Sequence, residues 1–199
     1  MSNSVNQYST LEEQAKALSY KEIMEAYGSD LSGNPSVYCG TYRKYNEGSL
    51  YGLWLDLTKF ADYEEFITIC RQLHKDEKDP EFMFQDYECF PSCLYSESCM
   101  DEDTFDSIIK YAELSEDEQE AFDDFLDLGN EFDMDDFHDR YVGHYDSEKD
   151  FAEHIIDECY DLEQMMGSLW SYFDFDAYAR DLFMSDYSMG EHNHVFRSY

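Results

Sequence analysis

Val37-Tyr38-Cys39-Gly40-Thr41-Tyr42 is β-branched and aromatic, and it gives the clearest strand signal in this 199-residue chain. A second such segment runs from Leu50 to Leu57, where leucines alternate with Trp54 and Asp56 and so share one face. Asn46-Glu47-Gly48-Ser49 lies between the two and has the residues of a tight turn. Together these segments predict an antiparallel β-hairpin.

A helix and a third strand follow the hairpin. Asp62, with Glu65 three residues later, is typical of a helix N-terminus. The apolar positions that follow recur at helical spacing, at Phe66, Ile69, Cys70 and Leu73. Glu81 to Glu88 is predicted to be a strand, and Pro91 ends the unit. Residues 35–94 are therefore expected to form a small α+β domain of hairpin, helix and strand.

The next stretch, Glu97 to Asp136, holds 17 acidic residues and a single basic one, Lys110. High charge with low hydrophobicity leaves a chain unfolded, but apolar residues are threaded through this stretch. They are Phe105, Ile108, Ile109, Phe122, Phe125, Leu126, Phe132 and Met134. We predict one helix over about 101–112 and a second from the capping box at Ser115 to Gly129, within an acidic helical domain at 95–136.

The final segment, 137–199, is predicted to form a strand and helix domain. Its expected elements are a strand over 140–145, a helix that buries Phe151, Ile155, Cys159 and Leu162, a helix over 176–184 and a strand over 191–197. Met165 to Phe175 is the most apolar run in the chain, and its part from Leu169 to Phe175 is expected to be core. Residues 1–34 form an N-terminal extension with one helix candidate, Leu11 to Tyr27. Because helices and strands do not alternate regularly, the fold class is α+β.

The sign of the charge is the strongest compositional feature. There are 47 acidic and 13 basic residues, for a net charge of −34. This excludes binding nucleic acid or an anionic membrane through a basic face, and it favours basic partners. We find no signal peptide and no long apolar run, so the six cysteines are expected to be reduced thiols in a cytoplasm.

We predict no catalytic site, cofactor or metal centre. The spacing of Cys89, Cys93 and Cys99 misses the usual zinc patterns, and His192 and His194 are more simply core or surface residues. The acidic runs that begin at Asp101 and Asp133 lack the glycine and the final acid of a calcium loop. No nucleophile elbow, phosphate loop or metalloprotease helix occurs.

The acidic surface has three interpretations that the residues alone leave open: a solvated face, a general acidic adaptor for basic proteins, or a nucleic-acid mimic. Duplex DNA carries one charge per about 1.7 Å of axis, so 34 net charges at that density would line about 58 Å. That length is near that of a slender protein of this size. A cation-storage protein that binds many calcium ions weakly is a further alternative.

One family resemblance favours the mimic. Residues 38–46, together with Gly48-Ser49-Leu50, Gly52 and Trp54-Leu55-Asp56-Leu57, resemble the ArdA antirestriction family of conjugative plasmids and transposons. Asp79-Pro80-Glu81-Phe82-Met83-Phe84-Gln85-Asp86-Tyr87-Glu88 completes the resemblance. The chain departs from the family pattern in two places. Its first 34 residues precede the usual start of the family, and Cys89-Phe90-Pro91 stands where a glycine-containing turn is expected.

The resemblance implies an elongated, non-enzymatic protein of three small domains that forms a homodimer and imitates bent duplex DNA. It would occupy the DNA-binding groove of type I restriction-modification enzymes in the cytoplasm of a bacterial host.

Two sets of residues are predicted to carry this activity. The phosphate stand-ins, which we call the acidic set, are Asp101, Glu102, Asp103, Asp106, Glu113, Glu116, Asp117, Glu120, Asp123, Asp124, Asp127, Asp133, Asp135 and Asp136. The predicted dimer contacts are Tyr141, Val142, Gly143 and Tyr145, because a short apolar strand can pair with its two-fold copy. An internal strand of the last domain's sheet is the alternative for these four residues. The run Leu169 to Phe175 is a second choice of interface.

Overall fold

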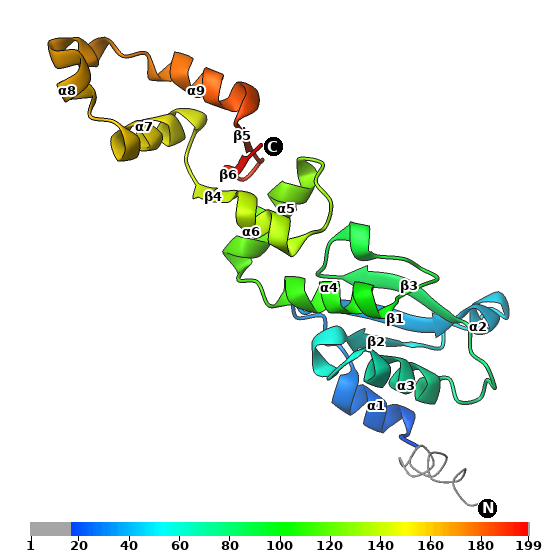
Figure 1. Ribbon diagram of the computed structural model, residues 1–199. Coiled ribbons are helices and arrows are strands. Elements are labelled where there is room, and N and C mark those ends of the chain that lie inside the picture. The colour runs from blue at the N-terminus through cyan, green and yellow to red at the C-terminus, as the bar shows by residue number, and fades with distance from the viewer. Residues whose placement is uncertain (1–16, 199) are drawn as a thin grey trace, which may run out of the picture. The chain divides into compact units, whose positions relative to one another are not determined.

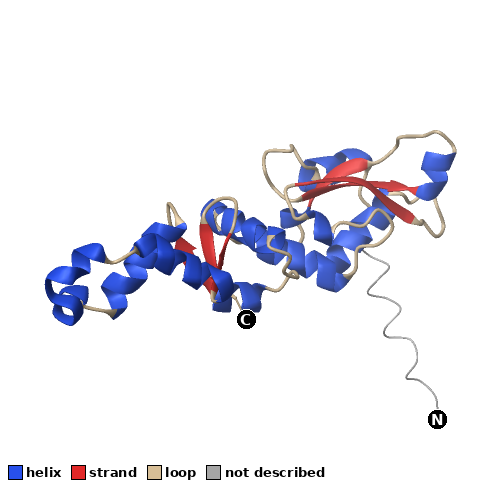
Figure 2. Cartoon of the chain, turned by 90° about the horizontal axis from the view of Figure 1, so that it is seen from above, coloured by secondary structure: helices blue, strands red, loops and turns tan. Residues whose placement is uncertain are grey.

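The computed structural model describes residues 17–198 (Figures 1 and 2). The chain divides into two compact units, Met1–Glu113 and Leu114–Tyr199. Each unit contains a three-stranded sheet with helices beside it, so the fold is α+β as predicted. The first part of the predicted 11–27 helix lies outside the described residues, and α1 spans Tyr20–Tyr27.

The sheet of the first unit confirms the predicted hairpin and third strand. Its strands are antiparallel, in the order β2-β1-β3, with the bounds β1 (Ser36–Thr41), β2 (Leu53–Asp56) and β3 (Phe82–Glu88). The connection between β1 and β2 is longer than predicted. Thr41 accepts a hydrogen bond from the Lys44 amide and begins a short helix, α2 (Tyr42–Asn46). Leu50 therefore lies outside the sheet and is 73% exposed.

Phe66 on α3 lies in the core of the first unit. Besides α2, the helices of this unit are α1, η1 (Leu57–Lys59), α3 (Tyr63–Leu73), η2 (Ser92–Leu94) and α4 (Glu102–Ala112). The Phe66 ring lies 5.9 Å from the ring of Phe84 on β3 and 5.6 Å from that of Phe105 on α4. Offset aromatic pairs at such distances stabilise a core beyond the area that they bury. The four α3 residues predicted to face inward are buried, and α4 belongs to this core.

A buried ionic cluster closes the end of the first sheet. The Lys44 ammonium lies 2.9 Å from the Glu77 carboxylate and 2.7 Å from that of Asp76. The side chains of Lys44 and Glu77 are 10% and 6% exposed. His74, fully buried, contacts the ammonium through Nδ1 at 3.2 Å. Because buried charges are retained only when paired, Lys44 balances acids inside the unit and is not a free surface cation.

The turn after β3 contains Cys89 at a place where a glycine-containing turn was expected. Cys89 has a φ of 63°, in the left-handed region that glycine adopts most readily. The chain therefore makes a glycine-like turn here with a cysteine in the position. Phe90 is buried after the turn, and its ring lies 4.9 Å from that of Tyr87.

The second unit has its own antiparallel sheet, in the order β4-β6-β5. Its strands are β4 (Tyr141–His144), β5 (Tyr187–Met189) and β6 (His194–Arg197). The first and last strands were predicted. The strand β5 was not predicted, because a strand of three residues is too short to show a period-2 pattern.

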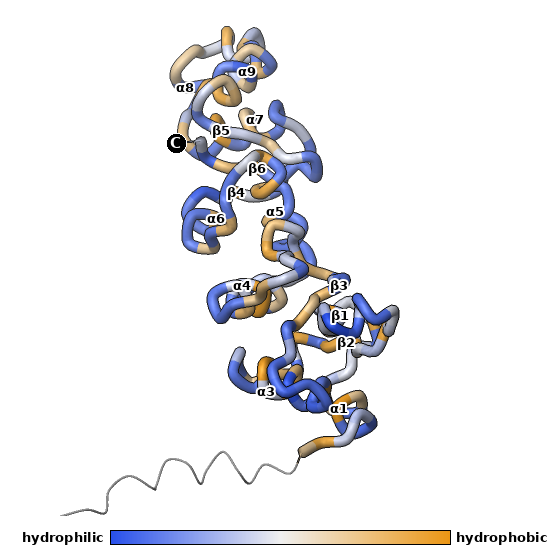
Figure 3. The backbone as a smooth tube through the Cα atoms, turned by 90° about the vertical axis from the view of Figure 1, so that its right-hand side faces the viewer, coloured by the Kyte–Doolittle hydropathy of each residue, from blue (hydrophilic) through white to orange (hydrophobic). Residues whose placement is uncertain are grey.

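The second unit also contains helices, and aromatic rings form the core that several of them share with the sheet. The helices are α5 (Glu116–Asp127), α6 (Met134–Arg140), α7 (Glu148–Cys159), α8 (Leu162–Met166), η3 (Gly167–Tyr172) and α9 (Phe175–Ser185). The Phe125 ring lies 5.7 Å from that of Phe137 and 5.6 Å from that of Phe196, so α5, α6 and β6 share one cluster. Figure 3 shows that α5 and α6 carry both hydrophilic and hydrophobic residues.

The predicted inward face of α7 was partly wrong. Phe151 is buried as predicted, together with Ala152 and Ile156, whereas Cys159 is exposed. The Phe151 ring lies 4.7 Å from that of Tyr187 on β5. Because β5 was not predicted, the side of α7 that packs against it could not be identified correctly from the sequence.

The apolar run Leu169–Phe175 is mostly exposed and is not core, which corrects a second prediction. Tyr172 is 82% exposed, Met165 66% and Leu169 60%. The longer run from Met165 lies largely in α8 and η3, of five and six residues, which are joined at Gly167 with a φ of 58°. Helices this short present side chains in all directions, so most of the apolar groups remain at the surface.

The predicted division into three domains and an extension is not confirmed. Residues 95–136 are divided between the units, since α4 packs on α3 in the first unit and α5 packs on β6 in the second. Within the first unit α1 buries Ile23 completely, so the described end of the predicted extension is part of the core.

Candidate acidic surface

The structure places most of the acidic set on helix surfaces. Twelve of its fourteen carboxylates are exposed, Asp136 is half-buried and Asp124 is buried. Five belong to the first unit, at α4 and its ends: Asp101, Glu102, Asp103, Asp106 and Glu113. The others belong to α5, α6 and their ends in the second unit.

Capping contacts fix the starts of the three acidic helices. The Asp101 carboxylate accepts a hydrogen bond from the Thr104 amide at 2.9 Å. The Thr104 side chain, followed by this backbone contact, holds the pKa of Asp101 below its usual range. Asp133 accepts from the Asp135 and Asp136 amides at 2.9 and 3.0 Å. A carboxylate at a helix N-terminus is stabilised because the backbone N–H groups point toward it.

The predicted capping box of α5 is present and adds a carboxylate to the surface. Glu118 accepts from the Ser115 amide at 2.9 Å and from its hydroxyl at 2.7 Å. The hydroxyl contact, followed by the backbone one, lowers the pKa of Glu118. Glu118 is exposed, although it was not included in the predicted acidic set. The same side chain serves both purposes.

The charges along α5 approach those of one DNA strand. Six carboxylates are exposed on this helix, at Glu116, Asp117, Glu118, Glu120, Asp123 and Asp127. They span eleven residue steps, which is about 16.5 Å of helix axis. This gives one carboxylate per about 3.3 Å, against one phosphate per about 3.4 Å along a single strand of duplex DNA. A single helix can therefore match the linear charge density of one strand.

Few cations oppose these carboxylates in the second unit. Residues 114–199 contain 25 acidic and 4 basic residues, for a net charge of −21. Arg140 pairs with Asp136 at 3.2 Å and Lys149 with Asp176 at 3.2 Å. The Asp136 charge is thus partly neutralised by its neighbour one helical turn away, and it contributes less to the surface than its exposed companions.

Asp124 was wrongly predicted as a surface carboxylate. It is 0% exposed and points into the turn between β5 and β6. Its carboxylate lies 2.9 Å from His192 Nδ1, and it accepts from the His192 amide at 3.0 Å and from the His194 amide at 3.4 Å. Asp124 therefore binds the polar groups of a turn, as a buried carboxylate must.

The four predicted dimer contacts lie in or next to β4. This strand is at one end of the second sheet and pairs with β6 on its inner side, so it belongs to the sheet of its own unit. Tyr141 packs inward, with its ring 5.5 Å from that of Phe137, and the Tyr145 ring lies 5.0 Å from that of Phe151. The register shifts between Tyr141 and Gly143, which places a bulge at Val142.

Over residues 17–198 no group of three or more His, Cys, Asp or Glu side chains is arranged to hold a metal ion. Within the same residues no helix has the length and apolar character needed to cross a membrane.

Comparison with known proteins identifies the family. Residues 37–196 match the family described as antirestriction protein (ArdA). The chain belongs to the ArdA antirestriction protein family. The match covers the hairpin, the acidic helices and β4, so the family resemblance extends well beyond the segments that first indicated it. A search of curated proteins found no match to the chain. Family membership implies an antirestriction function, which is carried out by interaction with restriction-modification enzymes.

Proposed function

We propose that this ArdA family protein mimics bent duplex DNA and competitively occupies the DNA-binding groove of type I restriction-modification enzymes. The observation that carries the proposal is the exposed row of carboxylates on α5, at the linear charge density of one DNA strand. Helix caps hold the starts of α4, α5 and α6, so the charges are presented by folded elements.

The mechanism is electrostatic and steric. Lysine and arginine side chains in a DNA-binding groove are attracted to carboxylates as to phosphates, which makes association fast and dependent on salt. A folded mimic also has its shape before binding. DNA has to be bent, at a cost of about 1–6 kcal/mol for a site of 20–30 base pairs, and the mimic avoids this cost. The inhibitor is not an enzyme, and it acts as a homodimer in the bacterial cytoplasm.

The decisive experiment measures ATP-dependent DNA cleavage by a purified type I restriction enzyme with increasing amounts of the protein. We expect inhibition at submicromolar protein that is relieved by competing specific DNA. An enzyme that is indifferent to micromolar protein would refute the proposal.

A charge-neutralised variant tests the mechanism. The ten most suitable positions leave the three helix caps and Asp136 unchanged. They are Glu102, Asp103, Asp106, Glu113, Glu116, Asp117, Glu120, Asp123, Asp127 and Asp135, each changed to its amide. The ten-position variant should lose inhibition while its circular dichroism is retained, and each single variant should inhibit almost as well as the parent. A single carboxylate that proved essential would indicate a local docking site instead.

A general acidic adaptor is the alternative, because a net charge of −34 attracts any polycation. The two functions differ in selectivity. An adaptor would be displaced from the restriction enzyme by polylysine and by histone-like proteins at equal charge concentration, whereas a shape mimic would be displaced best by duplex DNA that contains the recognition site.

A further inference from the structure

The second unit has a cavity outside the acidic set, at the end of α7. It is about 440 Å³ in volume, and it is lined by Ile156, Asp157, Tyr160, Asp161, Leu162, Glu163, Trp170 and Phe175. These residues come from α7, the α7–α8 connection, α8, η3 and the start of α9. The size is typical of sites that hold a side chain or a small ligand.

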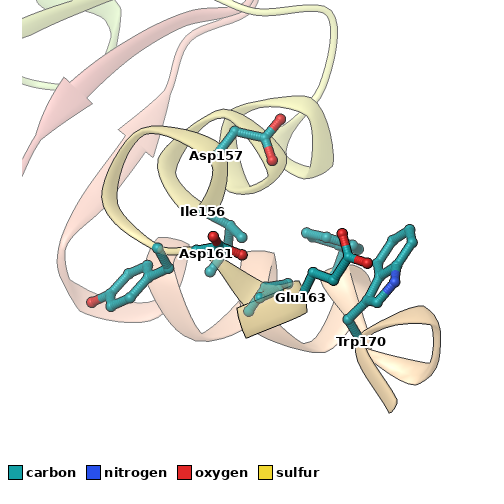
Figure 4. A pocket seen from close by; sticks show the side chains of 8 residues that line it. Ile156, Asp157, Asp161, Glu163 and Trp170 are labelled. Atoms are coloured by element: carbon teal, nitrogen blue, oxygen red, sulfur yellow. The ribbon is translucent and has the colours of Figure 1, made fainter. Parts of the chain in front are cut away.

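The lining combines aromatic faces with carboxylates. Trp170 and Tyr160 are 45% and 50% exposed, so their rings are available at the cavity. Asp157, Asp161 and Glu163 supply three acidic groups, and no basic residue contributes. Figure 4 shows the Glu163 carboxylate next to the Trp170 ring. An aromatic face beside a carboxylate is the chemistry that recognises an organic cation.

Two of the three carboxylates have no partner within the described residues. Asp161 accepts from the Gln164 amide at 2.9 Å and begins α8. The side chains of Asp157 and Glu163 make no hydrogen bond or ion pair with the rest of residues 17–198. A cation that enters the cavity would therefore meet two carboxylates that no internal base has already neutralised.

We propose that this cavity binds the guanidinium group of an arginine side chain presented by a partner protein. A guanidinium is planar, so it can stack on the Trp170 indole while its N–H groups donate to Glu163. A lysine ammonium is a compact, strongly hydrated charge that cannot do both. Met165 and Leu169 are exposed on α8 and η3, the elements that carry Glu163 and Trp170, and they provide apolar surface of the kind that surrounds such an anchor in an interface.

This contact differs in kind from the phosphate-like row on α5. A phosphate backbone offers no aromatic face, so the cavity would hold an arginine in a way that DNA does not. The inference deepens the proposed function, on which it rests for the identity of the partner. The chemistry of the cavity does not depend on that identity, and it can be tested without a restriction enzyme.

The test is an NMR titration of the full chain with capped amino-acid amides. The chain has two tryptophans, Trp54 and Trp170, and a Trp54→Phe variant assigns their indole signals. Nα-acetyl-arginine amide should shift the Trp170 indole signal with saturation in the millimolar range. Nα-acetyl-citrulline amide has nearly the same shape without the charge and should not. An equal response to citrulline or to Nα-acetyl-lysine amide would overturn the proposal.

Matched variants separate the cavity from the general negative field. Asp157→Asn with Glu163→Gln should weaken arginine binding about tenfold, since each exposed charge pair changes an affinity by up to about fivefold. Asp146→Asn with Glu191→Gln removes the same charge from exposed positions outside the cavity lining and should leave binding unchanged. Equal weakening by both double variants would show field attraction alone and refute the site. A Trp170 shift that follows protein concentration and not arginine would instead assign the surface to a second copy of the chain.

The outcome is independent of the inhibition assay. Failure of the titration would refute the arginine site while leaving the mimic proposal intact. A protein that bound arginine but did not inhibit the restriction enzyme would refute the mimic proposal and leave the arginine site intact.

Discussion

The buried carboxylate of Asp124 lies 2.9 Å from Nδ1 of His192, across the turn that joins β5 to β6. The same carboxylate accepts hydrogen bonds from the His192 and His194 amides. We predict that Asp124→Ala lowers the free energy of unfolding of the second unit by about 3–5 kcal/mol, because it leaves buried amides without an acceptor. Thermal unfolding followed by Trp170 fluorescence, in a Trp54→Phe background, measures the change. Asp127→Ala, an exposed carboxylate on the same helix, should change stability by less than about 0.5 kcal/mol.

Gly190 makes this contact sterically possible. A Cβ atom at Gly190 would overlap the Asp124 carboxyl group. Gly190→Ala should therefore destabilise the second unit by about 2–4 kcal/mol, as overpacking against a fixed group does. The double variant Gly190→Ala with Asp124→Ala removes the overlap, so its loss of stability should be smaller than the sum of the two single losses. Strict additivity would show that the two residues do not interact.

The His192 contact also predicts a pH dependence. The Asp124 hydrogen bond is the main cause of a raised pKa for His192 in the folded state. Because the pKa of His192 is higher in the folded than in the unfolded state, the imidazolium stabilises the fold. This stabilisation is complete below the unfolded pKa of about 6.5, and it is lost as the pH rises through the pKa of the folded state. The difference in unfolding midpoint between the parent and His192→Gln should thus be largest near pH 6 and shrink toward pH 9. A difference that grows with pH would contradict the assignment.

Asp124 also shows where sequence analysis reaches its limit. On α5 it follows Asp123, and both lie in the same run of acids and aromatics, yet only Asp124 is buried. The helical period places Asp124 between the inward Phe122 and Phe125. A local pattern does not show, however, that Asp124 would accept hydrogen bonds from the backbone amides of a distant turn. That turn is 68 residues away and follows the unpredicted β5.

Elements with strong local signals were predicted well. The Ser115 capping box, the inward row of α3 and the alternation in β2 each depend on neighbours within a few residues. The apolar run at 169–175 was wrongly predicted to be core, because burial depends on which elements cover a segment and hydropathy alone does not specify them. The exposure of twelve acidic side chains followed from charge, since an unpaired carboxylate is costly to bury.

The ionic cluster of the first unit predicts an asymmetric response to charge removal. Lys44→Met should lower the free energy of unfolding by about 3 kcal/mol, because it leaves the Glu77 carboxylate buried without its closest cation. Lys78→Met removes the same charge from an exposed position in the nearby loop, and we expect little change. Chemical denaturation followed by Trp54 fluorescence compares the two. Similar effects from both variants would indicate a response to net charge and not to the buried pair.

The β4 edge predicts a test of dimer formation. Within residues 17–198 only β6 pairs with β4, so the outer edge of β4 carries no strand of its own chain. We predict that Val142→Asp converts a dimer to a monomer in sedimentation velocity, because it places a charge at the proposed two-fold pairing. Val142→Thr keeps the shape and should remain dimeric. The bulge at Val142 is a feature that often protects a sheet edge from pairing. A Val142→Asp variant that remained dimeric would exclude β4 as the interface and favour the exposed Leu169 region.

The row of carboxylates on α5 predicts how inhibition depends on salt. Changing Glu116, Asp117, Glu120, Asp123 and Asp127 to their amides leaves the capping residues Ser115 and Glu118 in place, so the helix should persist. The association rate with the restriction enzyme should fall most at low ionic strength, and parent and variant should converge as salt shortens the Debye length to about 3 Å at 1 M. Stopped-flow measurements at several salt concentrations test this. A rate difference that is independent of salt would show that α5 acts by a local contact, whereas convergence is the behaviour of charges that act together through their field.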